Sequence, residues 1–278
     1  MALRDIASYP PQEPFTEIGG KYHLRVQELA RGVEGQCFAY GSDPYQEVAV
    51  FPASSPDGRV VAFMHGGGWT NGYKEWMAFM APQLNDLGVT FVSLGYRLAP
   101  GVVWPAGVQD AAAGIAWIHA NIATHGGDPA RLIVGGHSAG GHYASWLAVR
   151  DDWQSQAGVP DDVIKGAVPV SGVYDFTDGN GMPVRPRFLG ENLANDLDAS
   201  SLFTIKRTPP FLMAWGDRDF PHLMAQGERM AEALVAAGGE VEQLVLEDCD
   251  HLGASYACGN SVAPWLSRFD EWTIARQL

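Results

Sequence analysis

The sequence predicts an α/β fold in which a mostly parallel sheet is covered by helices on both faces. Short apolar runs alternate with segments of helical periodicity through most of the chain. The runs VVAFM at 60–64 and FLMAW at 211–215 are apolar at every position, which favours strands buried on both faces. Strands and helices that alternate in this way are typical of a doubly wound α/β domain.

The first part of the chain differs from this pattern. Residues 1–32 are rich in proline and charge before a helical segment at 21–31, and we expect them to drape over a pocket as a lid. Two short strands are predicted at 36–40 and 47–51, with the turn-forming sequence Gly-Ser-Asp-Pro between them. These strands would form an antiparallel edge of the sheet.

The alternation then continues to the end of the chain. Further strands are expected at 60–64, 90–94, 132–134, 166–170, 211–215 and 241–246, with helices near 75–87, 108–125, 139–148, 222–237 and 262–277. Residues 172–208 break the pattern and are expected to form a cap over the carboxyl ends of the strands, where ligands bind in such folds. No linker or repeat divides the sequence, so we expect one domain over 1–278.

The composition argues against several classes of function. A chain of 278 residues, 46% of them hydrophobic, can bury a full core. Its formal net charge of −14 argues against nucleic acid or an anionic membrane surface as a partner, because phosphate would be repelled. The first residues show neither a signal-peptide pattern nor an apolar span of about 20 residues. A cytoplasmic location is therefore expected.

The three cysteines predict neither disulfides nor a metal site. Cys37, Cys249 and Cys258 are odd in number, form no C-x-x-C pair, and have no histidine at zinc-ligand spacing. We expect the three cysteines to be reduced and to pack in the interior, and we expect no bound metal.

A candidate nucleophile stands at Ser138, in the sequence GHSAG between an apolar run and a helical segment. Strand, sharp turn and helix in this order predict a nucleophile elbow, in which glycines two residues before and after the serine let strand and helix approach closely. The serine hydroxyl would then be exposed at the carboxyl edge of the sheet. Ala139 would open the helix with a free amide that can bind an oxyanion.

Three consecutive glycines follow the strand at 60–64, within the sequence HGGGW at 65–69. Their unshielded amides can turn toward one point, as stabilisation of a tetrahedral oxyanion requires. Gly67 and Gly68, together with Ala139, are therefore the predicted oxyanion donors. A phosphate-binding loop is the alternative, but this loop lacks the Lys-Ser/Thr of a P-loop and the G-x-G-x-x-G dinucleotide pattern.

A serine nucleophile needs a histidine base, and the base needs an acid that fixes its tautomer. His251 is the candidate base, because it lies just beyond the last predicted strand, at the same sheet edge as Ser138. Packing or surface roles are expected for most of the other histidines. Asp217 and Asp219 both follow the strand at 211–215, and either could reach a histidine.

Four motifs in combination resemble those of α/β-hydrolases: HGGGW at 65–69, YRLAP at 96–100, GGDP at 126–129 and GHSAGG at 136–141. More narrowly, the chain is similar to hormone-sensitive-lipase-like carboxylesterases and to bacterial arylformamidases (kynurenine formamidases), from about residue 39 to the C-terminus. The resemblance implies a central, mostly parallel sheet of about eight strands and the order serine, acid, histidine along the chain.

The family pattern places the acid three residues after a glycine, which selects Asp219 after Gly216. Arylformamidases continue with a proline and a later glutamine, as Pro221 and Gln226 do here. The D-P-L-x-D acid motif that is usual in the esterases is absent, and Gly68 stands where arylformamidases often have a bulkier residue. The resemblance therefore leaves both branches open.

The expected function is hydrolysis of a carboxylic ester of a small or aromatic substrate through an acyl-enzyme, without a metal or an organic cofactor. Hydrolysis of an N-formylkynurenine-type amide is the alternative. A more remote alternative is a ligand-binding homologue without catalytic activity, since the fold serves as a receptor where the catalytic histidine is lost. A small-molecule ester or amide is thus the expected partner, and a homodimer is left open. Loops beside the pocket are expected to supply substrate-binding side chains: Trp69, Tyr73, Tyr96, Phe188, Phe220 and His222.

Overall fold

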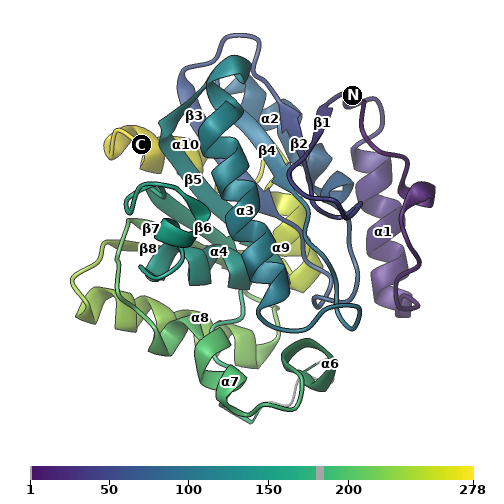
Figure 1. Ribbon diagram of the computed structural model, residues 1–278. Coiled ribbons are helices and arrows are strands. Elements are labelled where there is room, and N and C mark those ends of the chain that lie inside the picture. Colours follow the sequence, from purple (N-terminus) through teal and green to yellow (C-terminus); the bar gives the residue numbers. More distant parts are fainter. Residues whose placement is uncertain (1, 180–184) are drawn as a thin grey trace.

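The computed structural model describes residues 2–179 and 185–278, which form one sheet of eight strands with helices on both faces (Figure 1). The strand order is β1-β2-β4-β3-β5-β6-β7-β8. The pairs β1–β2 and β2–β4 are antiparallel, and the following pairs are parallel. The strands are β1 (Gln36–Ala39), β2 (Glu47–Phe51), β3 (Gly58–Met64), β4 (Thr90–Leu94), β5 (Gly127–His137), β6 (Gly166–Val170), β7 (Phe211–Gly216) and β8 (Val241–Leu246).

The strand pairing confirms the predicted mostly parallel sheet and its antiparallel edge, and burial agrees with it. Every residue of β2, β4, β6 and β7 is buried, which explains why these strands are largely apolar instead of alternating. In β8, at the opposite edge, only Leu246 is buried. β5 begins earlier than expected, because Gly127 already pairs with Gly58 of β3.

Helices cover the sheet from both sides. In Figure 1, α3 lies in front of the sheet and α2 and α10 lie behind it. The helices are η1 (Ile6–Ser8), α1 (Glu17–Leu29), η2 (Lys74–Met80), α2 (Ala81–Asp86), α3 (Ala106–Asn121), η3 (Ile122–His125), α4 (Ala139–Val149), α5 (Gln154–Ala157), α6 (Arg185–Leu189), α7 (Ala194–Ala199), η4 (Ser201–Phe203), α8 (Pro221–Ala236), α9 (His251–Ala257) and α10 (Pro264–Ala275).

Two helices differ from the sequence prediction for identifiable reasons. The expected helix at 75–87 is divided into the 3-10 helix η2 and the short helix α2. Pro82 stands in the first turn of α2, where its missing amide costs no hydrogen bond. Helix α1 begins before the expected residue 21, because the side chain of Thr16 caps it by accepting the amide of Gly19 at 3.1 Å.

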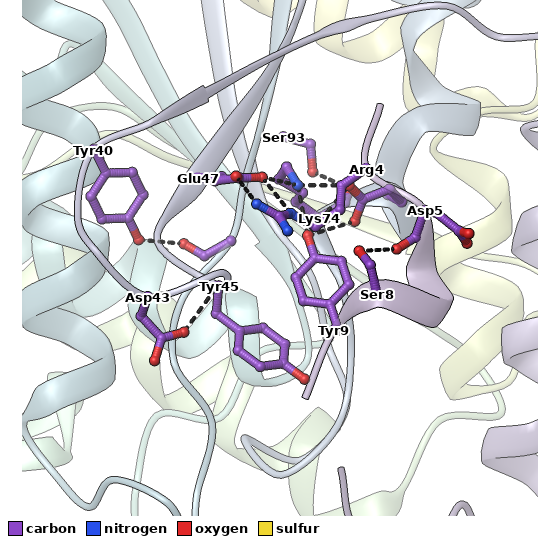
Figure 2. A network of polar contacts seen from close by, with 12 residues as sticks. Arg4, Asp5, Ser8, Tyr9, Tyr40, Asp43, Tyr45, Glu47, Lys74 and Ser93 are labelled. Atoms are coloured by element: carbon purple, nitrogen blue, oxygen red, sulfur yellow. Dashed lines mark hydrogen bonds and ion pairs between the residues drawn. The ribbon is translucent and has the colours of Figure 1, made fainter. Parts of the chain in front are cut away.

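The N-terminal segment is fixed to the body of the protein by a buried polar network (Figure 2). Lys74, only 1% exposed, donates to Glu47 at 2.9 Å, to Glu75 at 2.6 Å and to the hydroxyl of Tyr9 at 2.6 Å. Arg4 also pairs with Glu47. Two cations thus face two carboxylates, a balance that a buried ionic cluster needs. We call these five residues the N-terminal latch.

The segment at 172–208 packs beside the nucleophile helix in its described parts. His142 on α4 donates from Nε2 to the carbonyl of Ala199 at 2.8 Å, and Trp104 donates its amide to the carbonyl of Phe188 at 2.8 Å. Residues 180–184 of this predicted cap lie outside the described residues. In the described part of the chain, no helix is both long and apolar enough to cross a membrane.

Candidate active site

Ser138 lies at the turn between β5 and α4, in a strained backbone conformation. Its φ of 54° and ψ of −116° are unusual for a residue other than glycine. A Cβ on Gly136 would lie 2.3 Å from backbone atoms of Gly140, and a Cβ on Gly140 would lie 2.1 Å from the carbonyl oxygen of Met64. Both glycines are therefore required for strand and helix to approach this closely, as the elbow prediction states.

The structure brings together the predicted serine, histidine and acid. His251 Nε2 lies 2.9 Å from Ser138 Oγ, and His251 Nδ1 lies 2.8 Å from Asp219 Oδ1. Asp217 is exposed, and its amide continues the β7–β8 pairing by donating to the carbonyl of Leu246 at 3.1 Å. The geometry therefore selects Asp219 as the histidine's partner.

The charge of Asp219 is maintained in a buried position. Its side chain is fully buried, which by itself would raise the pKa of the carboxyl group. Hydrogen bonds outweigh this effect, chiefly the one from His251, and the pKa is lowered below the usual value. An ionised Asp219 holds the Nδ1–H tautomer of His251, so that Nε2 can accept the proton of Ser138.

The amides of Gly67, Gly68 and Ala139 are available as oxyanion donors. Among residues 2–179 and 185–278, no hydrogen bond donated by any of these three amides is found. Gly67 has a φ of +117° and Gly68 of +60°, so the loop uses the left-handed backbone that glycine permits. Its turn is closed by the carbonyl of Gly67, which accepts from the amide of Asn71 at 3.0 Å.

Ser138 and His251 border a cavity of about 340 Å³. Much of its wall comes from the N-terminal segment, whose particular side chains were not predicted. Most of these side chains are apolar, and the sequence does not distinguish apolar residues of a cavity wall from those of the core. A lid role for residues 1–32 stays a prediction. The cavity is lined by Phe15, Thr16, Ile18, Gly19, Tyr22, Gly67, Gly68, Thr70, Asn71, Trp76, His137, Ser138, His251 and Leu252.

None of the six predicted substrate-binding residues is among those that line this cavity, and four of them pack in aromatic clusters instead. Trp69 and Phe188 stack on each other with ring centroids 4.3 Å apart. Tyr96 is fully buried against His65, to whose carbonyl its hydroxyl donates at 2.7 Å. Tyr73 packs against Tyr9, Tyr45 and Trp76. Aromatic side chains in these loops are used as core because stacking with neighbours buries their large apolar area.

Phe220 and His222 lie near the site but outside the cavity. The ring of Phe220 is half exposed, and its centroid lies 5.0 Å from that of His251. His222 stacks on Phe220 with centroids 5.9 Å apart. A substrate-binding role for these two residues stays a prediction.

His137, for which a packing role was expected, lies directly beside the candidate base. Its ring centroid is 4.8 Å from that of His251, and its Nε2 donates to the carbonyl of His251 at 2.8 Å. Burial, with the neighbouring His251, lowers the pKa of His137 to about 3. The ring is therefore neutral near pH 7 and adds no charge beside the base.

The described residues contain no cluster of three or more His, Cys, Asp or Glu side chains that could hold a metal ion.

The site combines a strained serine at a strand-to-helix turn with an imidazole that links it to a buried carboxylate. This arrangement is typical of proteins that carry a nucleophile elbow on a doubly wound sheet. Residues 61–254 match the model of a family described by its alpha/beta hydrolase fold. The chain belongs to this family.

Two proteins of Mycobacterium tuberculosis are similar in sequence to this chain. The chain is 35% identical over 170 residues to a probable carboxylic ester hydrolase, LipM, covering 55% of this chain and 39% of that protein. It is 31% identical over 246 residues to the esterase LipC, covering 78% of this chain and 60% of that protein. The chain thus spans less than two thirds of the length of these relatives.

Among solved structures, esterase B from Lactobacillus rhamnosis matches with a TM-score of 0.77 and 20% identity, covering 93% of this chain and 91% of that one. At this identity the likeness establishes the fold alone, and it agrees with the family assignment.

Proposed function

We propose that this protein is a serine hydrolase that cleaves a carboxylic ester of a small or aromatic substrate through an acyl-enzyme. One observation carries the proposal: His251 lies within hydrogen-bonding distance of Ser138 on one side, at 2.9 Å, and of Asp219 on the other, at 2.8 Å. The names of LipM and LipC, an ester hydrolase and an esterase, support an ester substrate over other acyl derivatives such as amides.

The proposed reaction begins with transfer of the Ser138 hydroxyl proton to His251 Nε2 as Oγ attacks the ester carbonyl. The carbonyl oxygen becomes an oxyanion that accepts hydrogen bonds from the amides of Gly67, Gly68 and Ala139. Asp219 stabilises the imidazolium that forms. Collapse of the intermediate breaks the ester C–O bond, and His251 Nε2–H protonates the leaving alkoxide. A water molecule, activated by the same imidazole, then hydrolyses the acyl-enzyme.

The lining of the cavity supports a small, neutral substrate. No Asp, Glu, Lys or Arg is found among its described lining residues, and Phe15, Tyr22 and Trp76 supply aromatic walls. A volume of about 340 Å³ lies at the lower end of the range for small-molecule sites. These properties suit a short acyl chain or an aromatic group better than a long lipid.

Labelling with a fluorophosphonate probe tests the mechanism. The probe phosphonylates a serine only where an imidazole and an oxyanion hole activate it. We expect labelling of the wild-type protein and none of Ser138→Ala, which should keep its fold while kcat falls on the order of 10⁴-fold or more. Folded wild-type protein that takes up no label would instead support a non-catalytic ligand-binding homologue.

We also propose that the reaction needs no metal or organic cofactor, because backbone amides and the histidine supply the stabilisation that a metal provides elsewhere. Activity lost on chelation and restored by a metal would contradict this. A cytoplasmic location is proposed as well. It is supported by the three free cysteines Cys37, Cys249 and Cys258, since reduced thiols suit a reducing compartment.

A further inference from the structure

The carboxylate of Asp219 is hydrogen-bonded on one side only. Its Oδ1 accepts from His251 Nδ1 at 2.8 Å and from the amide of Phe220 at 2.7 Å. Its Oδ2 is buried and has no partner that meets hydrogen-bond geometry within the described residues. A buried anionic oxygen without a donor is costly, since the lost hydration is not replaced.

Ser171 lies at the carboxyl end of β6, and the neighbouring strand β7 leads into the turn that carries Asp219. Ser171 directly follows β6 and is 2% exposed, and its amide extends the β6–β7 pairing by donating to the carbonyl of Ala214 at 2.8 Å. Its Oγ is buried and, in the part of the chain that the structure describes, has no partner of good geometry. Interaction with this hydroxyl is nevertheless one of the causes that lower the pKa of Asp219.

The backbone of Ser171 is strained. Its φ is +49°, in the left-handed region where a residue other than glycine is strained. Such strain persists where the surroundings hold it, and it concentrates at functional sites. A hydroxyl hydrogen rotates freely about its C–O bond, so the two unsatisfied groups can pair once Oγ itself moves through a change in the χ1 torsion of Ser171.

We propose that Ser171 is a positioning residue whose hydroxyl donates to Asp219 Oδ2. A carboxylate held through one oxygen can turn about its Cβ–Cγ bond, whereas donors on both oxygens fix its plane. Because Asp219 aims the imidazole of His251 at Ser138, the Ser171 hydroxyl would hold the base in line through the acid. The consequence for turnover rests on the proposed serine-hydrolase function. The contact between Ser171 and Asp219 does not depend on that function.

Tyr174 is the competing donor and supplies a matched control. Its hydroxyl is also buried without a partner of good geometry within the described residues, and it lies near Ser145 and Gly172. Tyr174→Phe removes a hydroxyl from the same buried region without touching Ser171. If Tyr174 were the donor, this variant, and not Ser171→Ala, would disturb Asp219.

Steady-state kinetics of Ser171→Ala, Ser171→Gly and Tyr174→Phe on a p-nitrophenyl ester test the role. We expect the two Ser171 variants to lower kcat by about 10- to 100-fold, the value of one hydrogen bond to a charged group. KM should stay within about twofold, because Ser171 does not line the cavity. Tyr174→Phe should keep kcat.

Thermal unfolding separates positioning from a merely structural role. Glycine adopts a φ of +49° without strain, so Ser171→Gly should keep Tm within about 2 °C of the wild type while kcat falls. A Ser171→Gly protein whose kcat falls only together with its Tm would overturn the proposal. So would a Ser171→Ala protein with unchanged kcat.

A spectroscopic measurement tests the contact without relying on activity. In protein labelled with ¹³C at the aspartate carboxyl carbons, with Ser138→Ala as background and Asp219→Asn for assignment, we expect the Asp219 resonance to move in Ser171→Ala and not in Tyr174→Phe. An unmoved resonance in Ser171→Ala would refute the contact. Failure of the proposed function would appear separately, as turnover that survives Ser138→Ala.

Discussion

His251 Nδ1 lies 2.8 Å from Asp219 Oδ1, whereas Asp217, two residues earlier in the same turn, is exposed. The difference follows from the turn after β7. The amide of Asp219 donates to the carbonyl of Gly216 at 3.2 Å, and a Cβ on Gly216 would lie 2.0 Å from the carbonyl oxygen of Cys249. This close approach brings the turn against the loop that carries His251.

We therefore predict that Asp219→Asn lowers kcat far more than Asp217→Asn does. An amide at position 219 cannot hold the Nδ1–H tautomer of the histidine, and this defect costs about 10⁴-fold in serine proteases. Asp217→Asn changes an exposed side chain and should leave kcat within about twofold. Steady-state kinetics of the two variants on one ester substrate provide the measurement. The reverse ranking would show that the acid is misassigned.

The fold, Ser138 and His251 could be predicted from the sequence because local chemistry determines them. Ser138 needs glycines on both sides of a strand-to-helix turn, and the apolar runs identify the strands that carry it. The acid could be narrowed from the residues alone only to Asp217 or Asp219, since both follow the same strand. The family pattern, not the spacing, selected Asp219.

The cavity wall could not be predicted residue by residue, because it forms between segments far apart in the sequence. Phe15 and Tyr22 contact Trp76 of η2, and the latch also holds residues 4–9 against β2 and η2. Trp69 was expected in the cavity, but it stacks on Phe188. Aromatic residues in core and in pocket have the same sequence signature, and tertiary packing decides between them.

The latch predicts a link between a distant ion pair and substrate binding. Arg4→Met should leave Glu47 paired with Lys74 alone, destabilise the protein by about 1–3 kcal/mol, and loosen the segment that carries Phe15. We expect KM to rise with a smaller change in kcat. Urea unfolding and steady-state kinetics measure the two effects.

Arg25→Met is the matched control for this prediction. Arg25 pairs with Glu28 on the surface of α1, where both side chains are more than half exposed, so the change should cost little. Equal effects of the two substitutions on KM would mean that the latch does not maintain the cavity wall.

We predict that three buried histidines make the protein lose stability already below about pH 6.5. Burial lowers the pKa of His65 to about 4 and those of His137 and His142 to about 3. Below about pH 6.5 the unfolded chain binds protons at these positions and the folded protein does not, so stability decreases as pH falls. The slope should approach about 4 kcal/mol per pH unit once all three protons are taken up by the unfolded chain.

Urea unfolding at pH 7.5, 6.5 and 5.5 measures this slope. Glu47 and Asp219, whose pKa values are lowered, also lose stabilising interactions in acid, but only as pH falls below the ordinary carboxylate range near 4. An onset near pH 6.5 therefore identifies the histidines. A free energy of unfolding that is flat between pH 6.5 and 5.5 would rule out neutral, buried histidines as its source.

The choice between ester and formyl amide depends on room at Gly68. A Cβ built on this residue meets nothing within 4 Å, and Gly68 lines the cavity, so the space beside the oxyanion donors exceeds what a formyl group requires. We expect Gly68→Ala to lower kcat/KM for p-nitrophenyl butyrate more than for the acetate, because the added methyl group occupies acyl space. An equal loss on both esters would point instead to strain at the φ of +60°.

The last prediction concerns the bond that is cut, and we expect esters to be preferred over an N-formyl arylamine such as N-formylkynurenine. Both reactions pass through the same oxyanion, so Gly67, Gly68 and Ala139 do not separate them, whereas the leaving group does. An aryl amide nitrogen must be protonated by His251 as it departs, which demands close placement of the imidazole, while an ester oxygen leaves more readily. The measurement is kcat/KM for N-formylkynurenine and for p-nitrophenyl acetate and butyrate, each divided by its uncatalysed rate because the esters are intrinsically more reactive. If the formyl amide is then preferred by more than about 100-fold, equivalent to about 2.7 kcal/mol of transition-state stabilisation, the protein is an arylformamidase and the ester assignment is wrong.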